Sequence, residues 1–321
     1  MVKTITNIDD YIKSCDVETL PINYDDKMEV ELFGKKLLLE NDPWMWHLHL
    51  KVTDMCNANC NFCVEQNSPC KNNECDVDTY IKQVSRMLTE MDKNHILYSV
   101  SVTGGEPLLY KGFERLCDVL YSHPISFLTL NTNVSFLEQC LILVDGLFDV
   151  VDISRHAIAD TENNEVFGSQ MISIDDLKRI KDKLKSTDMR IQCVMDKVNS
   201  VEKMLKFIDE FSFANDISFR KLMKLGDEYG ISYKNDDLIY EKVLGYAYDH
   251  WDFWEQTIQD YYVYEVWNTG KTDVTFSYSN MKMLREVEEK EPKEICREFI
   301  IHPNGIISGS WNPNEKVILR P

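Results

Sequence analysis

Strand-like and helix-like segments alternate from about Trp44 to Met223, and this alternation constrains the fold more than any other feature of the chain. The strand-like segments are short and rich in apolar and β-branched residues, whereas the segments between them carry apolar residues at helical spacing. Repeated β-α units of this kind pack around a parallel sheet. The strands are predicted at Trp46 to Thr53, Tyr98 to Thr103, Ser126 to Asn131, Val150 to Ser154, Arg190 to Met195 and Ile217 to Met223.

Helices are predicted to begin near Asp76, Phe113, Ser135, Ile174 and Val201. Asp76 and Ser200 are of the residue types that cap helix N-termini, because their side-chain oxygens accept a hydrogen bond from an unpaired backbone N–H.

Three cysteines, Cys56, Cys60 and Cys63, lie on the segment CNANCNFC directly after the first predicted strand. Iron–sulfur clusters are usually bound by four cysteine thiolates, so a compact set of three predicts a four-iron cluster with one iron open to a ligand. The residues between the cysteines favour turns, and Phe62 is placed to shield the cluster and to stack on a ligand. The spacing alone also fits a zinc site or part of an ordinary ferredoxin.

A run of Gly104, Gly105, Glu106 and Pro107 ends the second predicted strand. Two glycines at this place let the backbone approach a ligand closely, because no Cβ stands in the way. By itself the run also fits a plain glycine turn closed by proline. The cysteine triplet followed by GGEP is far more specific than either motif alone.

Together the two motifs resemble the signature of the radical S-adenosylmethionine (radical SAM) superfamily. The resemblance implies a partial (β/α)6 barrel whose C-terminal strand ends carry the site. It also implies a 4Fe–4S cluster on Cys56, Cys60 and Cys63, with SAM on the open iron and an external electron donor of the flavodoxin or ferredoxin type. Reductive cleavage of SAM would then yield a 5′-deoxyadenosyl radical that abstracts hydrogen from a substrate. No residue is identified as a catalytic acid or base.

The same resemblance assigns further residues to the SAM site. In the family, the GGEP run receives the amino group of SAM. Other contacts are expected where NTNV, VVDISRHA and RIQCV end later strands, although NTNV has valine in place of the glycine of a Thr-Asn-Gly pattern. The segment RIQCV is similar to the fifth strand of the molybdenum-cofactor GTP cyclase branch. The residues assigned to SAM in this way are Phe62, Gly104, Gly105, Glu106, Pro107, Thr132, Asn133, Ser154, Arg155 and Val194.

Four residues are candidates for substrate contact. His156 follows the fourth strand, and it either touches substrate or only lines a polar strand end. Gln192 matches a polar strand position of the cyclase branch. Arg220 and Lys221 lie in an otherwise apolar strand, where an unpaired buried cation is costly. One of the two is therefore expected to face the barrel mouth and an anionic group of SAM or substrate, or else to lie at a solvent-facing edge.

The chain divides into three expected parts. Residues 1–43 include the alternating run MEVELFGKKLLLE and are predicted to form a β-hairpin flap before the barrel at 44–225. Residues 226–321 are predicted to form a small α+β extension with a helix from about Leu238 to Tyr262 and two hairpins. The last hairpin resembles a twitch or SPASM-like extension that carries auxiliary clusters. Only Cys296 remains of its ligands. The place where the second cysteine is expected reads Ser308, Gly309 and Ser310, and serine binds iron far more weakly than a thiolate, so the auxiliary cluster is predicted to be absent.

The remaining cysteines form no second convincing ligand set. Cys117 and Cys140 fall in helical patterns and Cys193 in a strand, so all three are expected to be buried as small apolar side chains. Cys70 and Cys75 flank the cysteine loop, either as ordinary loop residues or as a late ligand or redox-sensitive pair.

Composition sets the outer limits of function. A chain of 321 residues with 44% hydrophobic and 28% charged residues has material for one large core. A formal net charge of −19 argues against nucleic-acid partners, which bind clustered Lys and Arg. No apolar run reaches membrane-spanning length, and the N-terminus lacks a secretory signal, so a cytoplasmic protein is expected.

The reaction outcome stays open at this level. The tail favours tailoring of a peptide or small metabolite, whereas the cyclase-like fifth strand favours rearrangement of a nucleotide or nucleoside. A cluster-bearing regulatory protein that has lost catalysis is the alternative outside the enzyme class. Fold resemblance alone does not identify a substrate.

Overall fold

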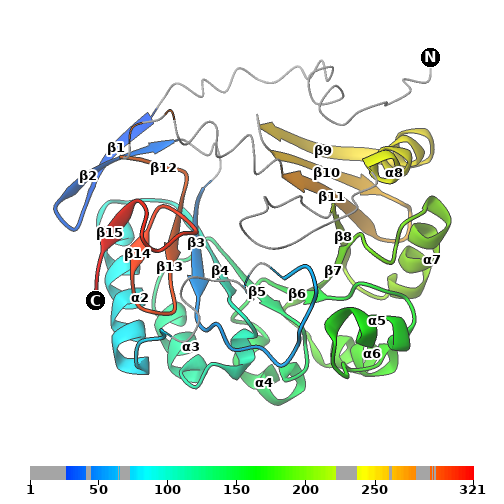
Figure 1. The fold of residues 1–321 in the computed structure, drawn as a ribbon, viewed down its shortest axis with the longest axis horizontal. Helices are drawn as coiled ribbons and strands as arrows, with labels where there is room; N and C mark the ends of the chain where they lie inside the picture. Colours follow the sequence, from blue (N-terminus) through cyan, green and yellow to red (C-terminus); the bar gives the residue numbers. More distant parts are fainter. Residues whose placement is uncertain are drawn as a thin grey trace.

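The computed structural model describes residues 27–40, 45–63, 65, 73–221, 237–259, 262–279, 290, 292 and 294–321. Six parallel strands follow one another in sequence order through its centre (Figure 1). They are β3 (Trp46–Lys51), β4 (Tyr98–Thr103), β5 (Phe127–Thr132), β6 (Val150–Ser154), β7 (Asp188–Val194) and β8 (Asp216–Arg220). The predicted parallel sheet is therefore confirmed, with strand bounds that differ by up to a few residues. The sixth prediction extends past the described residues.

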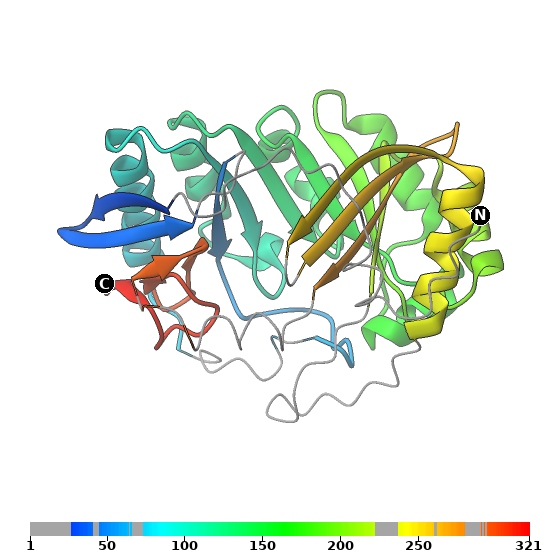
Figure 2. The ribbon, with the colours of Figure 1, turned by 90° about the horizontal axis from the view of Figure 1, so that it is seen from above.

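Helices lie along one side of these strands, as Figure 2 shows. They are α2 (Val77–Lys93), α3 (Phe113–Tyr121), α4 (Leu137–Val144), α5 (Asp160–Phe167), α6 (Ile174–Lys183) and α7 (Val201–Phe211). The expected N-caps are confirmed, because the side chains of Asp76 and Ser200 accept hydrogen bonds from Thr79 N and Lys203 N. Helix α5 was not predicted. Its sequence DTENNEVF has only a short apolar face, which gives little periodic signal.

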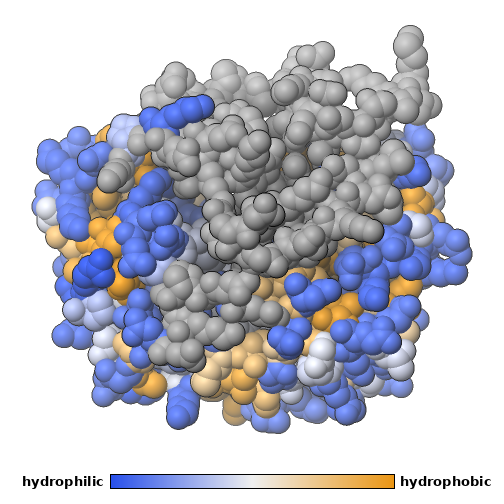
Figure 3. All heavy atoms as spheres, in the orientation of Figure 1, coloured by the Kyte–Doolittle hydropathy of each residue, from blue (hydrophilic) through white to orange (hydrophobic). Residues whose placement is uncertain are grey.

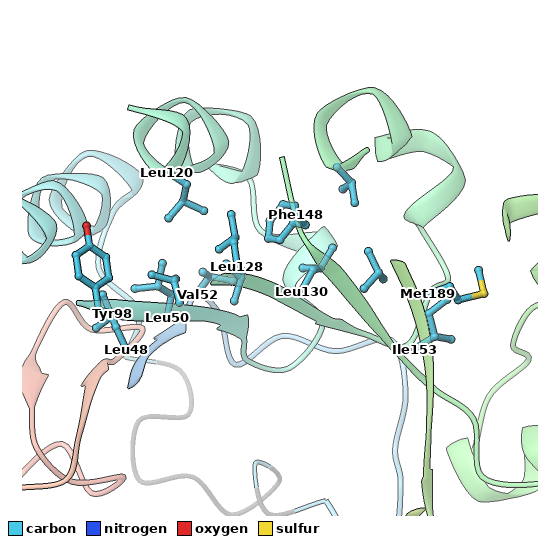
Figure 4. Packing of buried hydrophobic residues seen from close by; sticks show 14 of the residues in the cluster. Leu48, Leu50, Val52, Tyr98, Leu120, Leu128, Leu130, Phe148, Ile153 and Met189 are labelled. Atoms are coloured by element: carbon cyan, nitrogen blue, oxygen red, sulfur yellow. The ribbon is translucent and has the colours of Figure 1, made fainter. Parts of the chain in front are cut away.

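The hydrophobic core fills the space between the helices and the sheet (Figure 4). Alternate residues of β3, namely Leu48, Leu50 and the following Val52, point into this core and are almost completely buried. The residues between them face the other way. We call this other side of the sheet, away from the helices, the inner face.

Polar side chains occupy the inner face, where closed barrels are filled by branched apolar residues. Asn131 donates from Nδ2 to Ser101 Oγ at 2.7 Å. Deeper along the sheet, the Arg190 guanidinium contacts Asp216 at 2.5 Å and Asp152 at 3.5 Å. The inner face is thus suited to a polar ligand.

The C-terminal part of the chain extends the sheet at both edges, giving a sheet of 12 strands within the described residues. At one edge β11 (Asp273–Ser279) pairs parallel with β8, and β10 (Tyr262–Asn268) and β9 (Asp252–Gln259) follow antiparallel. At the other edge β13 (Glu298–Ile301) pairs parallel with β3, and β14 (Ile307–Ser308) and β15 (Val317–Leu319) follow. Figure 1 shows these two additions at opposite ends of the strand series. The two predicted tail hairpins are confirmed.

The predicted helix from Leu238 to Tyr262 is wrong in its second half. Helix α8 (Asp237–His250) ends at His250, and β9 begins at Asp252. The segment DFWEQTIQ has aromatic and β-branched residues that suit a strand, and its pairing with β10 satisfies its backbone groups. Tertiary pairing has therefore overridden a weak helical pattern.

The N-terminal hairpin is confirmed as β1 (Lys27–Leu32) and β2 (Lys35–Glu40). Its two turn residues, Phe33 and Gly34, both have positive φ angles, of 53° and 74°. This is the geometry of a two-residue turn whose twist matches that of the strands. The short strand β12 (Ile295–Cys296) pairs parallel with β2, so the hairpin contacts the tail.

The surface in Figure 3 is mainly hydrophilic around its rim, in line with the abundance of charged residues. Among the described residues, no helix has the length and apolar character needed to cross a membrane.

Candidate active site at the strand ends

The three predicted cluster ligands lie on the loop that leaves the C-terminal end of β3. Cys56 is exposed, and Cys60 and Cys63 are half-buried. The loop turns tightly, since Cys63 N donates to Cys60 O at 3.1 Å, and it is tied to the end of α5 by Asn59 N, which donates to Phe167 O at 2.7 Å. In the described part of the chain, no three His, Cys, Asp or Glu side chains are arranged to hold a single metal ion. A cubic cluster needs wider spacing, because each thiolate binds a different iron.

Burial favours the protonated form of the Cys56 and Cys60 thiols when no metal is bound. It raises the pKa of Cys60 to about 12, with a further contribution from the neighbouring thiols of Cys63 and Cys56. Partial burial of its thiol also raises the pKa of Cys56, although the residue as a whole is exposed. Metal ligation requires thiolates, so cluster binding must release these protons.

The two glycines of the GGEP run pack against the start of the cysteine loop. A Cβ on Gly104 would lie 2.4 Å from Thr53 O, and one on Gly105 would lie 2.2 Å from Met55 O. Gly104 also has a φ of +145°. The close approach lets Gly105 N and Glu106 N donate to Thr53 O and Met55 O, both at 2.7 Å. The glycines therefore fix the cysteine loop to the end of β4.

Glu106 connects the GGEP run to the end of β5. Its buried carboxylate accepts hydrogen bonds from Thr132 Oγ1 at 2.6 Å, Asn133 N at 2.7 Å and Leu108 N at 3.1 Å. Burial raises the pKa of Glu106, although the three donors act in the opposite direction. Pro107 follows as the first residue of the short helix η2 (Pro107–Leu109).

Asn133 brings the end of β5 into contact with the cysteine loop. Its Nδ2 lies 2.8 Å from Asn57 Oδ1 and 3.7 Å from Cys56 Sγ. The next residue, Val134, has a φ of 68° and is buried. Val134 stands where a Thr-Asn-Gly pattern would have glycine, and it adopts a left-handed conformation that glycine takes without strain. The segment is therefore similar to that pattern in backbone conformation as well as in sequence.

Phe62, His156 and Val194 come together from three elements. The His156 ring packs edge-on against Phe62 at 5.1 Å and stacks on Phe167 at 5.0 Å. Its Nδ1 accepts a hydrogen bond from Val194 N at 3.1 Å. Burial, together with the charge of Arg155, lowers the pKa of His156 to about 3, so the ring is neutral at pH 7. His156 therefore forms part of a wall beside the cysteine loop.

Arg155 points into the protein at the end of β6. Its guanidinium donates to Ala157 O at 2.8 Å, Ile158 O at 2.7 Å and Asp160 Oδ1 at 2.7 Å. These contacts order the segment that leads into α5. The neighbouring Ser154 is half-buried and pairs in register with Gln192. Assignment of Ser154 and Arg155 to SAM binding stays a prediction.

The other two substrate candidates separate at the end of β8. The Arg220 side chain is exposed, and its guanidinium donates to the Gln192 amide oxygen at 2.9 and 3.2 Å when that amide takes the orientation that satisfies both groups. Lys221 is buried, and its backbone N donates to Ser277 O at 3.0 Å. The structure thus brings Gln192 and Arg220 together on the inner face.

A second polar group on the inner face was missed by the sequence analysis. His49 Nε2 lies 3.0 Å from Glu298 Oε2, and Trp311 Nε1 donates to Glu298 Oε1 at 2.5 Å. Although burial opposes ionisation, the contacts with His49 and Trp311 hold the pKa of Glu298 below its usual range. The alternation of His47, His49 and Lys51 with leucines marks the polar side of β3 in the sequence. No pattern in the neighbouring sequence predicts that Glu298 lies beside His49, because the two residues meet only through the pairing of β13 with β3.

In the tail hairpin of β13 and β14, Ser308 and Ser310 belong to a network of hydrogen bonds with the buried His302. Ser308 Oγ lies 2.8 Å from His302 Nε2 and donates to Ser310 O at 2.7 Å. Cys296 is buried, and a Cβ on Gly309 would lie 2.6 Å from its Sγ. The absence of an auxiliary cluster stays a prediction.

The remaining cysteines lie mostly as expected. Cys117 and Cys193 are buried, which is confirmed, whereas Cys140 is only half-buried on α4. Cys75 N donates to Pro303 O at 2.9 Å, in contact with the tail hairpin. Cys70 lies outside the described residues.

Comparison with known proteins identifies the family of this chain. A family model described as the Radical SAM superfamily matches residues 50–211, which is half of the chain. The GTP 3′,8-cyclase of Chlorobaculum tepidum is 30% identical over 125 residues, covering 38% of this chain and 35% of the cyclase. That of Aquifex aeolicus is 26% identical over 163 residues, covering 48% and 47%. The chain thus spans between about a third and a half of the length of these relatives.

Among solved structures, SuiB of Streptococcus suis bound to the precursor peptide SuiA has a TM-score of 0.60 and 18% identity, covering 85% of this chain and 60% of SuiB. SuiB bound to S-adenosylmethionine has a TM-score of 0.59 and 19% identity, covering 85% and 61%. At this level of identity the likeness shows a shared fold.

Proposed function

Because this chain belongs to the radical SAM superfamily, we propose that it binds a 4Fe–4S cluster through Cys56, Cys60 and Cys63 and uses it to cleave S-adenosylmethionine. The observation that carries the proposal is the joint packing of the two motifs. The GGEP backbone holds the first residues of the cysteine loop by two hydrogen bonds of 2.7 Å, and Asn133 reaches the thiol of Cys56. Residues from three strand ends therefore converge on the loop.

The residues present fit such a cluster. The donor set consists of three thiols on one turn-rich segment, which is the ligand chemistry of iron–sulfur clusters. Gly104 and Gly105 keep the backbone of the strand end against the loop, where any side chain would overlap the carbonyls of Thr53 and Met55. The Asn133 amide beside Cys56 supplies an N–H near a ligating sulfur, an interaction that tunes the reduction potential of such clusters.

When bound and reduced, the cluster supplies the electron that splits SAM into methionine and a 5′-deoxyadenosyl radical. The chain contributes orientation and exclusion of water. Glu106 and Thr132 lock the GGEP run to β5, which fixes the backbone groups proposed to receive the SAM amine. Phe62 and the neutral His156 form a wall with little affinity for water beside the loop.

A peptide is the proposed substrate. The likeness to SuiB covers 85% of this chain, so it extends beyond the barrel. The inner face also suits a peptide, because the Asn131 amide and the partly exposed Arg190 guanidinium carry donors and an acceptor for its polar groups. The electron donor is proposed to be of the flavodoxin or ferredoxin type.

A nucleotide substrate is the second candidate, favoured by the identity to GTP 3′,8-cyclases. That identity covers less of the chain than the likeness to SuiB does. The two candidates differ in which added compound is converted to a product when SAM is cleaved, a peptide or a nucleotide.

Anaerobic reconstitution followed by reduction with dithionite tests the proposal. We expect about four irons per chain and formation of 5′-deoxyadenosine from SAM. The variant C56A/C60A/C63A should lose both, whereas C140A, which removes a half-buried helical cysteine, should retain both. A fully loaded cluster that forms no 5′-deoxyadenosine with SAM, GTP or candidate peptides would favour the regulatory alternative. Consumption of GTP, with no peptide modified, would favour the nucleotide candidate.

A further inference from the structure

We propose that Lys51 is a positioning residue that ties both flanks of the cysteine loop to the end of β3. The proposal rests on the proposed function, because it assigns to Lys51 the task of holding the loop in the shape that receives the cluster. It concerns a residue on the inner face that neither motif includes.

Lys51 is the last residue of β3, and its side chain is only 5% exposed. Its Nζ lies 2.9 Å from Asp54 Oδ1 and also contacts Glu65 Oε2. The carboxylates are themselves 4% and 19% exposed. Burial opposes the charge on Lys51, but the two carboxylates outweigh it and raise the pKa of the lysine. One ammonium group therefore holds two buried acids.

The two acids lie on opposite sides of the ligand triplet. Asp54 precedes Cys56 by two residues, and Glu65 follows Cys63 by two residues. A single cation between them closes the chain into a loop whose ends cannot separate without breaking a buried ion pair. Among the described residues, no hydrogen-bond donor other than Lys51 reaches the buried carboxylate of Asp54. Asp54 thus depends on Lys51.

Glu74, which lies shortly before α2, contacts the residues at the start of the cysteine loop. Glu74 Oε1 accepts hydrogen bonds from Thr53 Oγ1 and from Asp54 N, both at 2.7 Å. The next residue, Cys75, is held by Pro303 O of the tail hairpin. Thr53 and Asp54 are therefore joined to Glu74 by hydrogen bonds, next to the ion pairs of Lys51.

Stability alone does not explain this arrangement. Buried ion pairs contribute little net stability compared with apolar residues of similar volume, because removing charges from water is costly. They do impose a defined geometry, since each charge must meet its partner. A geometric role accounts for the position of Lys51 between the acid that precedes the three cysteines and the acid that follows them.

The test uses metal-free protein and compares K51M with the wild type. Alkylation of Cys56, Cys60 and Cys63 by iodoacetamide is followed by mass spectrometry, with Cys140 as the internal reference. We expect the alkylation rate of the three loop thiols to rise about tenfold in K51M, because loss of the cation leaves two buried acids unpaired and opens the loop. The variant K36M is the matched control, since Lys36 forms an ion pair with Glu29 whose members are 75% and 62% exposed. K36M should alkylate at the wild-type rate.

A triple variant separates positioning from simple charge balance. K51M/D54N/E65Q removes the unpaired charges and should recover most of the thermal stability lost in K51M. If Lys51 positions the loop, the thiols stay more reactive than in the wild type, and the reconstituted cluster loses iron to a chelator faster. Wild-type alkylation in K51M, or full protection of the thiols in the triple variant, would overturn the proposal. Because alkylation needs no cluster, the result is independent of whether 5′-deoxyadenosine forms.

Discussion

The two edges of the strand series differ in how they are held. At the cysteine edge, β3 meets β13, and buried charges and short backbone hydrogen bonds hold the cysteine loop from several sides. At the far edge, β8 meets β11, and the side chain of Arg220 at the end of β8 is exposed, although the next residue, Lys221, is buried. Rigid support at one edge and accessible polar groups at the other suit a molecule that fixes a cofactor and admits a variable ligand. The difference teaches that substitutions should act on folding at the first edge and on recognition at the second.

The largest effect is expected for Gly105→Ala at the cysteine edge. The new Cβ would lie 2.2 Å from Met55 O, so the strand end and the loop must move apart. We expect a loss of about 3 kcal/mol or more in the free energy of unfolding, measured by chemical denaturation, together with loss of iron on reconstitution. Gly245→Ala in α8, at the far edge, is the control, because nothing lies within 4 Å of its Cβ. It should be neutral or stabilising by up to about 1 kcal/mol. Equal stabilities of the two variants would remove the contrast between the edges.

Acid should weaken the cysteine edge through His302. Burial, with the charge of Lys51, lowers the pKa of this buried histidine to about 4. Because the ordinary histidine pKa is about 6.5, the unfolded chain binds a proton that the folded chain excludes. Its contribution to stability is therefore present above pH 6.5 and is lost as the pH falls toward 4, by at most about 3 kcal/mol.

Denaturation curves recorded between pH 7 and pH 4.5 measure this loss. The variant H302Q should show a flatter pH dependence than the wild type over the same range. An unchanged slope would show that other groups, such as the buried His156, dominate the acid response.

A smaller effect is expected at Val134, where the chain has a φ of 68°. Both V134A and V134G lose the buried side chain, but only glycine adopts this conformation without strain. We expect V134G to be more stable than V134A by about 1 kcal/mol, which reverses the usual order of the two residues. Thermal or chemical denaturation of V134G and V134A measures this difference. If V134A were the more stable of the two, the backbone would have to relax once the valine is removed.

The smallest effect on folding is expected for Arg220→Met at the far edge. This guanidinium is exposed and forms no ion pair with any other described residue, so stability should change by less than about 0.5 kcal/mol. Formation of 5′-deoxyadenosine without substrate should stay within about twofold of the wild type, since Arg220 lies outside the cysteine loop. A large loss of stability would show that the far edge is as tightly held as the first.

Much of the strand core was predictable because its signals are local. The core-facing leucines of β3 alternate with polar residues, and the caps Asp76 and Ser200 stand one residue before their helices. Helix α5 escaped prediction because it has little apolar periodicity, and the end of α8 was misplaced because aromatic residues suit either type of element.

The candidate site was predictable only in part, for the same reason. The three cysteines and GGEP are recognised as motifs, and their order in the chain placed them on neighbouring strands. Contacts between separate segments carry no such motif. The assignment of Arg155 to SAM from its position at a strand end stays a prediction, and no local pattern indicated that its guanidinium donates to Ala157, Ile158 and Asp160.

The sequence by itself determined the ligand chemistry and the repeated β-α pattern, because thiol spacing and hydrophobic periodicity are properties of short segments. Only the tertiary structure decided that Glu298 lies beside His49, that Lys51 joins the two flanks of the cysteine loop, and that the tail adds strands to both edges of the sheet. Parallel pairing joins segments that are far apart in the chain, and the side chains that meet across it are selected by register and burial. Those are properties of the packed sheet.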